Sequence, residues 1–379
     1  EERIETSRVL TPGLPLALEE HAYAHAQRVA RIERVRQTGV PTRWNGLIED
    51  PVLVEWLARE FGDERVWSAT QLESYAKCPW AFFSERLLHL EKLEDPDEEM
   101  DPLVRGTVLH DALRRFYESA RARVGGPVLL RPPDRAWAEA MLLDCLDAAL
   151  ESAAETEWMG NPALRGAKRE ELRRMLRRYL EWETGENEKL FTGRGRARQR
   201  LCTGVVEHEL QFDDVVLETA GVRVRFRGFI DRVEVGVDTR VPDADGYVAA
   251  VDYKTSKAGA PGGGEKEAWE DDVVLQVPLY AYALERLRPG ARAARVEYRA
   301  VKQHEAVHAL ELVRVVGIGA EEDEEAREKM ERALEAVGEH VLAMRAGVFP
   351  ARPAPSCGCP PFCHAWDICR VKGGPRRKE

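Results

Sequence analysis

The chain has 379 residues, 44% of them hydrophobic, so it is long enough to bury one large core or two ordinary ones. It carries 56 basic and 67 acidic residues, and its net charge of -11 gives no overall attraction to a polyanion. No apolar run of about 18 residues occurs, and the first residues lack the pattern of a secretory signal, so we expect neither a membrane span nor export, and a cytoplasmic location.

By composition the chain divides into a helical connector and a larger unit. Residues 1–66 have a helical pattern, and we interpret them as a connector to a missing N-terminal region. Residues 67–379 form the larger unit, in which about residues 134–195 are helical and charged and are predicted to be an insertion. Between Arg165 and Arg200 there are 12 Lys or Arg and 6 Asp or Glu, which fits either a solvated helix face or a path for phosphate groups.

Two helices at the start of the larger unit have clear sequence signals. Ser68 and Gln71 have the spacing of a capping box, and Pro79 should end the helix that they open. After an acidic loop, residues 102–120 have the apolar period of an amphipathic helix. Its apolar stripe is Leu109, Leu113 and Phe116, and a second face carries Gly106, His110 and Arg114.

The second half of the unit alternates strand and helix signals, which predicts an α/β fold with helices packed around a mixed sheet. The sequence PDADG supplies a turn between two of the strands, so we expect these strands to be neighbours in a hairpin. The strands are expected at residues 205–212, 222–231, 247–255, 294–301 and 308–316, and the helices at about 271–288 and 320–346.

Three charged residues lie on that hairpin: Asp231, Asp252 and Lys254. Two carboxylates brought together repel each other and raise each other's pKa unless a cation lies between them, and hard oxygen ligands suit Mg²⁺ or Mn²⁺. Lys254 projects from the same face of its strand as Asp252, because residues two apart share a face. Carboxylates, a metal and an ammonium group together suit hydrolysis of a phosphodiester. An isolated D-x-K is also a common surface salt bridge, so both interpretations stay open at this point.

Four ordered motifs bear on this choice through a resemblance. They are G-x-x-x-H at Gly106–His110, G-F-I-D ending at Asp231, D-Y-K at Asp252–Lys254, and Q-x-x-x-Y at Gln276–Tyr280. In this order they resemble the RecB-like branch of the PD-(D/E)XK nucleases. The stretch SATQLESYAKCPWAFF and the cysteine-rich end are similar to the iron-sulfur nuclease module of AddB-type helicase-nuclease subunits. The resemblance covers about residues 67–370 and implies a restriction-endonuclease-like core, in which a mixed central sheet is flanked by helices.

The resemblance also implies a role for each motif residue. The catalytic residues would be His110, Asp231, Asp252, Lys254, Gln276 and Tyr280. The two aspartates and Tyr253 would ligate the catalytic metal, and His110 would be a further ligand or would orient one. The lysine would position or activate the attacking water, and the glutamine and tyrosine would contact the DNA or brace the catalytic strand. Taken alone, a histidine on an amphipathic helix and a Gln/Tyr pair one turn apart are ordinary features.

Seven cysteines, four of them in SCGCPPFCHAWDICR near the C-terminus, favour a metal site over a disulfide framework. The resemblance implies a 4Fe-4S cluster that joins the two ends of the unit. Its ligands would be Cys78, Cys359, Cys363 and Cys369. The usual spacing would place one ligand at Pro360, so Cys357 is an alternative to Cys359. Thiolates alone do not separate iron-sulfur from zinc, so a zinc site made by the four C-terminal cysteines also stays open.

As the resemblance implies, we expect an Mg²⁺-dependent deoxyribonuclease, exonuclease or endonuclease, that cuts single-stranded DNA during processing and recombinational repair of double-strand breaks. No G-x-x-x-x-G-K-[ST] motif occurs, so the motor would lie in a helicase subunit or in the missing N-terminal region. Trp80, Phe82 and Phe83 could contact the DNA strand or belong to the core. Two other classes stay open: a non-catalytic DNA-end-binding or scaffolding subunit, and a zinc-stabilised structural domain.

Overall fold

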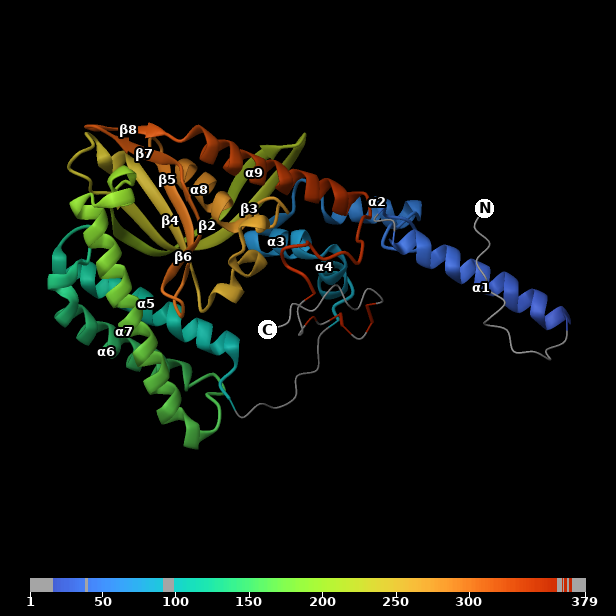
Figure 1. Ribbon diagram of the computed structural model, residues 1–379, viewed down its shortest axis with the longest axis horizontal. Coiled ribbons are helices and arrows are strands. Elements are labelled where there is room, and N and C mark those ends of the chain that lie inside the picture. Colours follow the sequence, from blue (N-terminus) through green and yellow to red (C-terminus); the bar gives the residue numbers. More distant parts are fainter. Residues whose placement is uncertain are drawn as a thin grey trace.

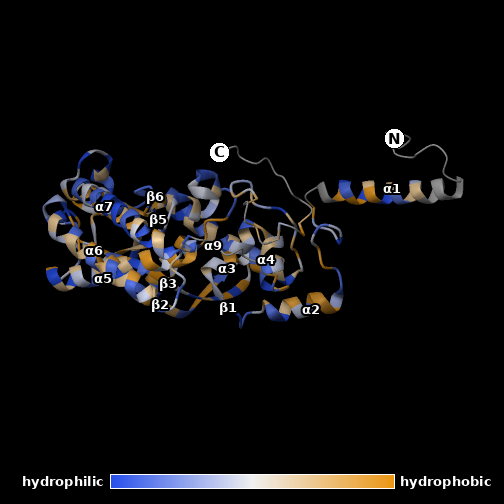
Figure 2. Cartoon of the chain, turned by 90° about the horizontal axis from the view of Figure 1, so that it is seen from below, coloured by the Kyte–Doolittle hydropathy of each residue, from blue (hydrophilic) through white to orange (hydrophobic). Residues whose placement is uncertain are grey.

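The computed structural model describes residues 16–37, 40–90 and 99–359, together with Cys363, Ala365, Trp366, Ile368 and Cys369. Helix α1 (Leu16–Gln37) stands apart from the body of the molecule, and Figure 2 shows the same separation from a second side. Helix α2 (Pro51–Glu60) lies against α9 (Glu324–Arg345) (Figure 1). No helix in these ranges combines the length and the apolar character that a membrane crossing needs.

A mixed sheet of six strands runs through the centre of the body. Its strands are β1 (Val66–Ser68), β2 (Thr203–Thr219), β3 (Val222–Gly236), β4 (Tyr247–Lys254), β5 (Arg292–Ala300) and β6 (Glu305–Glu311). The order is β1-β3-β4-β5-β6, and β2 pairs with β3 as the other arm of a long hairpin. The β1/β3 and β4/β5 pairs are parallel and the others are antiparallel. Strands β7 (Val313–Val316) and β8 (Gly319–Glu322) form a separate sheet.

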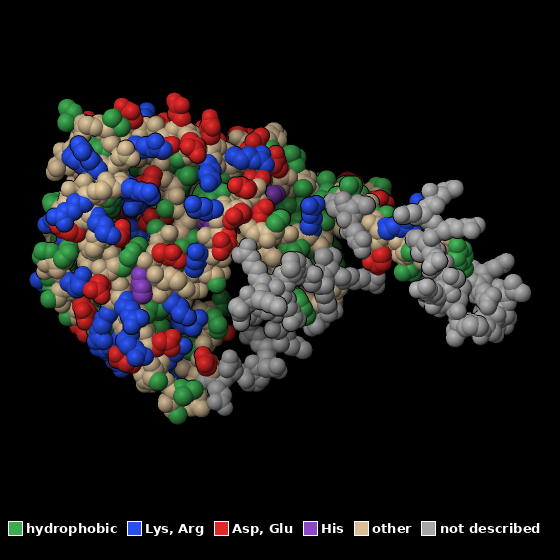
Figure 3. Space-filling view, in the orientation of Figure 1, with side chains coloured by type: hydrophobic (Ala, Val, Ile, Leu, Met, Phe, Trp, Pro, Cys, Tyr) green, Lys and Arg blue, Asp and Glu red, His purple; other side chains and the backbone are tan. Residues whose placement is uncertain are grey.

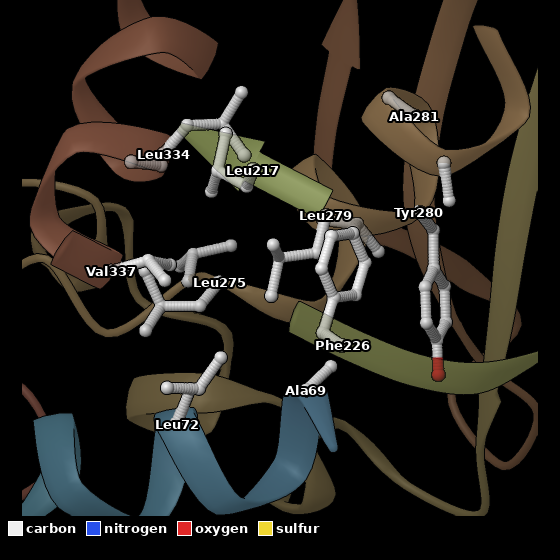
Figure 4. Close-up of a cluster of buried hydrophobic side chains, with 14 of the residues drawn as sticks. Ala69, Leu72, Leu217, Phe226, Leu275, Leu279, Tyr280, Ala281, Leu334 and Val337 are labelled. Atoms are coloured by element: carbon white, nitrogen blue, oxygen red, sulfur yellow. The ribbon is translucent and has the colours of Figure 1, made fainter. Parts of the chain in front are cut away.

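Helices cover both faces of the sheet, which confirms the predicted mixed α/β class (Figure 1). On one face α3 (Ala69–Lys77), α4 (Pro79–Arg86), α8 (Gln276–Leu287) and α9 build the larger apolar cluster, part of which is shown in Figure 4. On the other face lie α5 (Pro102–Val124), α6 (Arg135–Ala153) and α7 (Pro162–Thr192). Strand β4 serves both faces, because Val248 and Ala250 join the first cluster whereas Val251 and Tyr253 join the second.

Short 3-10 segments connect these elements: η2 (Pro132–Asp134), η3 (Gly195–Gln199), η4 (Ala244–Gly246), η5 (Lys257–Gly259), η6 (Pro261–Gly264) and η7 (Lys266–Ala268). The capping box predicted at the start of α3 is present. Ser68 Oγ accepts a hydrogen bond from the Gln71 N–H at 3.2 Å, and Gln71 Oε1 accepts one from the Ser68 N–H at 3.1 Å. Pro79 follows the end of α3, as expected, and it occupies the first turn of α4, where a missing N–H costs nothing.

Several boundaries differ from the sequence-based expectation. The helix after the glycine-rich loop begins at Gln276 rather than at Asp271, because Asp272 has a φ of +54° and interrupts helical geometry. The strand expected at residues 308–316 is divided into β6 and β7. After β6 the Leu312 N–H still donates a hydrogen bond to the Ala294 carbonyl of β5, at 2.8 Å, and the chain then leaves the central sheet. The last helix, α9, begins at Glu324 and not at about residue 320, because residues 319–322 form β8.

A buried ion network joins α7 to the sheet, and the sequence did not predict it. It consists of Glu183 of α7, Arg232 and Glu234 of β3, and Arg295, Glu297 and Arg299 of β5, with side chains 7% exposed or less. Arg299 Nη1 lies 2.7 Å from Glu183 Oε1, and Arg232 Nη2 lies 2.6 Å from Glu234 Oε1. Equal numbers of guanidinium and carboxylate groups allow these charges to be buried without a net charge.

The side chains that were candidates for DNA contact are largely engaged within the fold. Phe82 is fully buried, and the rings of Trp80 and Phe83 stack with centroids 5.7 Å apart. In the basic segment, Arg173 is paired with Asp147 of α6 at 2.7 Å. Figure 3 shows basic and acidic side chains interspersed on the face that carries α5 and α7, so this face has no continuous field of one sign.

Candidate active site

The hairpin of β3 and β4 places the two predicted aspartates beside each other. The strands are antiparallel with Arg232 opposite Val251, so the next pair in this register is Asp231 and Asp252. Side chains of directly opposed residues share one face of the sheet. Asp231 Oδ2 accepts a hydrogen bond from the Tyr253 N–H at 2.7 Å, which fixes this carboxylate against the end of β4.

The carboxyl group of Asp252 is almost completely buried, with 3% of the residue exposed. Burial raises its pKa to about 6, and Asp231 acts in the same direction against the attraction of Lys254. Asp252 Oδ2 lies 2.6 Å from Lys254 Nζ, but in the described ranges it has no partner that meets hydrogen-bond geometry. This oxygen therefore keeps acceptor capacity that a cation beside the second carboxylate could use.

His110 of α5 contacts Asp231 and the backbone of Tyr253. Its Nδ1 lies 3.3 Å from Asp231 Oδ1, and its Nε2 lies 3.0 Å from the carbonyl oxygen of Tyr253. Burial would lower the pKa of His110, but the hydrogen bond and charge of Asp231 outweigh burial and raise it. The hydroxyl of Tyr253 lies 3.1 Å from Arg232, within the buried ion network, so the residue faces the site with its backbone and not with its hydroxyl.

Lys254, Gln276 and Tyr280 form a chain of contacts that ends on Asp252. Lys254 Nζ donates to Gln276 Oε1 at 3.0 Å, and Gln276 Nε2 donates to Asp252 Oδ1 at 2.7 Å. The same Nε2 lies 2.8 Å from the hydroxyl of Tyr280, one helical turn further along α8. Figure 4 shows Tyr280 at the margin of the apolar cluster, with its oxygen directed away from the other labelled side chains. The structure thus brings all six predicted catalytic residues together.

A groove of about 580 Å³ lies beside His110. It is lined by Gly106, Thr107, His110, Asp111 and Arg114 of α5 and by Glu209 of β2. The polar face predicted for the first amphipathic helix therefore forms one wall of this groove, whereas the predicted apolar stripe of that helix is buried. The groove gives a ligand an approach to the carboxylates from the side of α5.

The donor atoms at this site suit a hard cation. In the part of the chain that is described, no three His, Cys, Asp or Glu side chains form a group that could hold a metal by themselves. The available donors are the carboxylates of Asp231 and Asp252 and the backbone oxygen of Tyr253, whereas both ring nitrogens of His110 already lie against oxygen atoms. Oxygen-rich sets of this kind match Mg²⁺ or Mn²⁺ better than they match soft metals.

Cys78, the predicted upstream cluster ligand, lies at the junction of α3 and α4, and among the described residues the cysteines do not form a group that could hold a metal ion. The described cysteines are free thiols. Burial is the main reason that the pKa of Cys78 is raised to about 11, and the thiols of Cys363 and Cys369 act in the same direction. The same two thiols, after burial, raise the pKa of Cys359. The pKa of Cys357 is also raised by burial, but its charged neighbours are Lys77 and Asp271 and not these cysteines.

Two residues around the site, Glu73 and Tyr298, were not anticipated. Glu73 Oε1 lies 3.0 Å from the Gln276 N–H and accepts a hydrogen bond from the Tyr298 hydroxyl at 2.6 Å. Glu73 precedes Gln276 by 203 residues, so no local pattern could have paired them. The available signal was a charged residue between Leu72 and Tyr75, on the inner side of a short helix.

Comparisons with known proteins identify the family of this chain. A curated relative, an ATP-dependent helicase/deoxyribonuclease subunit of Ruminiclostridium cellulolyticum, is 26% identical over 249 residues. The match includes 62% of this chain and 19% of the relative, so the chain spans a minor part of that protein's length. The profile of the PD-(D/E)XK nuclease superfamily matches residues 66–370, and this chain belongs to that superfamily.

Proposed function

We propose that this chain is the nuclease domain of a helicase-nuclease and that it hydrolyses single-stranded DNA with Mg²⁺ or Mn²⁺ during break processing and recombinational repair. The observation that carries the proposal is the carboxylate pair of Asp231 and Asp252, with Lys254 Nζ 2.6 Å from Asp252. Membership of the superfamily supports a deoxyribonuclease, and the relative's name supports a helicase subunit as partner. The cytoplasmic location stays a prediction from the sequence.

The contacts support a separate role for each residue. Asp231, Asp252 and the carbonyl of Tyr253 would hold the cation, which when bound lowers the pKa of a water molecule and offsets phosphate charge. Burial alone would lower the pKa of Lys254, but the charge of Asp252 outweighs burial, so the pKa is raised. The lysine is therefore an ammonium group at neutral pH, so it stabilises charge on the phosphate and does not accept a proton. His110 orients Asp231 and the Tyr253 carbonyl through its two ring nitrogens.

Cutting of labelled DNA tests the proposal. The full chain should cut single strands with Mg²⁺ or Mn²⁺, and EDTA should stop the reaction. Asp252→Ala and Lys254→Ala should each lower the rate by at least about 100-fold, as loss of a charge-stabilising group does, with DNA binding nearly unchanged. The matched controls Asp245→Ala and Lys266→Ala remove the same charges at exposed positions and should cut normally. Cutting that survives both site substitutions would overturn the assignment, and DNA-end binding without cutting would favour a scaffolding subunit.

The second part of the proposal is a 4Fe-4S cluster held by Cys78, Cys359, Cys363 and Cys369, and the effect of Cys363 and Cys369 on the pKa of both Cys78 and Cys359 supports it. In this arrangement the C-terminal segment is tied to the junction of α3 and α4. Two backbone bonds already make that connection, from the Trp80 N–H to the Pro350 carbonyl at 3.2 Å and from the Ala354 N–H to the Lys77 carbonyl at 2.8 Å. Brown protein with iron and sulfide in equal amounts is the expected result. Colourless protein that contains zinc would support the zinc-stabilised alternative.

A further inference from the structure

A buried carboxylate, Glu73 of α3, lies directly behind the candidate active site. The residue is 3% exposed. Its Oε1 accepts hydrogen bonds from the Leu275 N–H at 3.2 Å, from the Gln276 N–H at 3.0 Å and from the Tyr298 hydroxyl at 2.6 Å. Its Oε2 lies 3.5 Å from Lys77 Nζ. Three donors on one oxygen and a cation beside the other make Glu73 a fully engaged buried anion.

Glu73 takes the place of a capping residue for α8. The residue before this helix, Leu275, has no side chain that can accept a hydrogen bond from the first turn. Orphan N–H groups at a helix N-terminus need an acceptor and favour a negative charge. Burial would raise the pKa of Glu73, but Lys77, Lys254 and the hydrogen-bond donors outweigh burial and lower it, so the carboxylate stays charged. The first residue of α8 is therefore held by an anion that comes from a distant helix.

That first residue is Gln276, and its side chain organises the site. Gln276 binds Lys254 Nζ through Oε1 and Asp252 Oδ1 through Nε2. The ring of Tyr298, the other group held by Glu73, lies 5.1 Å from Lys254 Nζ. The Glu73 carboxylate thus holds two groups, Gln276 and Tyr298, that contact the ammonium of Lys254.

We propose that Glu73 is a positioning residue for phosphodiester hydrolysis: by anchoring Gln276 and Tyr298, it sets the orientation of Lys254 and Asp252 toward the scissile phosphate. This inference rests on the proposed nuclease function. Glu73 touches neither substrate nor metal and acts through its two partners. Displacement of a reacting group by about 1 Å can cost about 100-fold in rate, so loss of this anchor should appear mainly in kcat.

Glu73→Gln removes the charge with little change in shape, and Asp323→Asn is its matched control. Asp323 is also a buried carboxylate at a helix N-terminus, where its Oδ1 accepts from the Ala326 N–H of α9 at 3.2 Å, far from the site in the chain. With single-stranded DNA, Glu73→Gln should lower kcat by about 10- to 100-fold with KM changed less than about threefold. Asp323→Asn should leave both constants within about twofold. Equal kcat values for the two variants would show that Glu73 is only a helix cap and would overturn the proposal.

A double-mutant cycle separates positioning from general stability. Gln276→Ala removes the side chain that Glu73 positions. In that background Glu73→Gln should lower kcat by less than about threefold further, because the effects of substitutions at coupled residues are not additive. Full additivity of the two losses would contradict the proposal.

A crystal structure of Glu73→Gln tests the same contact without any cutting. We expect Gln276 to lose its contact with Lys254 or Asp252, and unchanged contacts would overturn the positioning role. If the unaltered chain cuts no DNA, the proposed function fails, and this crystal structure still decides the positioning role.

Discussion

The buried ion network that holds α7 against the sheet leads to a quantitative prediction for Glu183→Ala. Glu183 accepts from the guanidinium groups of Arg232 and Arg299 and from the hydroxyl of Tyr117, and its side chain is 2% exposed. Without it, three arginines face two glutamates, which leaves one net positive charge out of reach of water. Breaking a buried ion pair by removing one partner costs about 3–5 kcal/mol.

Glu186→Ala, on the same helix, is the matched control. Its partner Lys189 is 59% exposed, and surface pairs of this kind contribute about 0.3–0.5 kcal/mol. The free energy of unfolding, measured by urea titration with circular dichroism, should therefore be lower by about 2.5 kcal/mol or more in Glu183→Ala than in Glu186→Ala. A difference below about 1 kcal/mol would refute the idea that these charges are interdependent and shielded from water.

Three further predictions concern single groups. Tyr253→Phe should keep kcat within about threefold, because the residue faces the site with its backbone and not with its hydroxyl, and should cost about 1 kcal/mol of stability; a 100-fold loss of rate would contradict this. Burial would raise the pKa of Glu297, but Arg295 lowers it to about 2, so its contribution is complete above about pH 4.5 and is lost as the pH falls through about 2. The free energy of unfolding should decline as the pH falls through that window, and it should decline less steeply in Glu297→Gln. Equal dependence on pH in the two proteins would contradict the lowered pKa of Glu297. Cys359→Ser should lower the iron content and Cys357→Ser should not, and the reverse result would exchange the two ligands.

The centre of the fold could be predicted because its signals are local. A turn sequence between two Val-rich runs predicts the β3/β4 hairpin, and the antiparallel register then places Asp231 opposite Asp252. Helical spacing likewise puts Gln276 and Tyr280 on one side of α8, where both meet the site. The divided strand at residues 308–316 was missed, because neither Gly nor Pro marks the point where the chain changes sheets.

The surroundings of the site could not be predicted, because they depend on contacts between distant segments. The alternation of Arg232 and Glu234 with apolar neighbours in β3 indicates a polar strand face, but it does not show that α7 covers this face with Glu183. Glu73 could not be placed for the same reason, since the N–H groups of Leu275 and Gln276 that it accepts from lie more than 200 residues away. The roles of the motif residues and the cluster ligands stay predictions that the experiments above address.

The way α7 is attached limits how this domain can be rebuilt. An apolar contact accepts many side chains of similar size. The contact between α7 and the sheet instead requires opposite charges at matching positions. If residues 162–192 were transferred to a related sheet, the helix would not pack stably unless Arg232 and Arg299 were transferred as well. The helix and the two strands beneath it, β3 and β5, therefore make one unit for the design of chimeras, although residues 193–221 separate α7 from β3 and residues 193–291 separate it from β5.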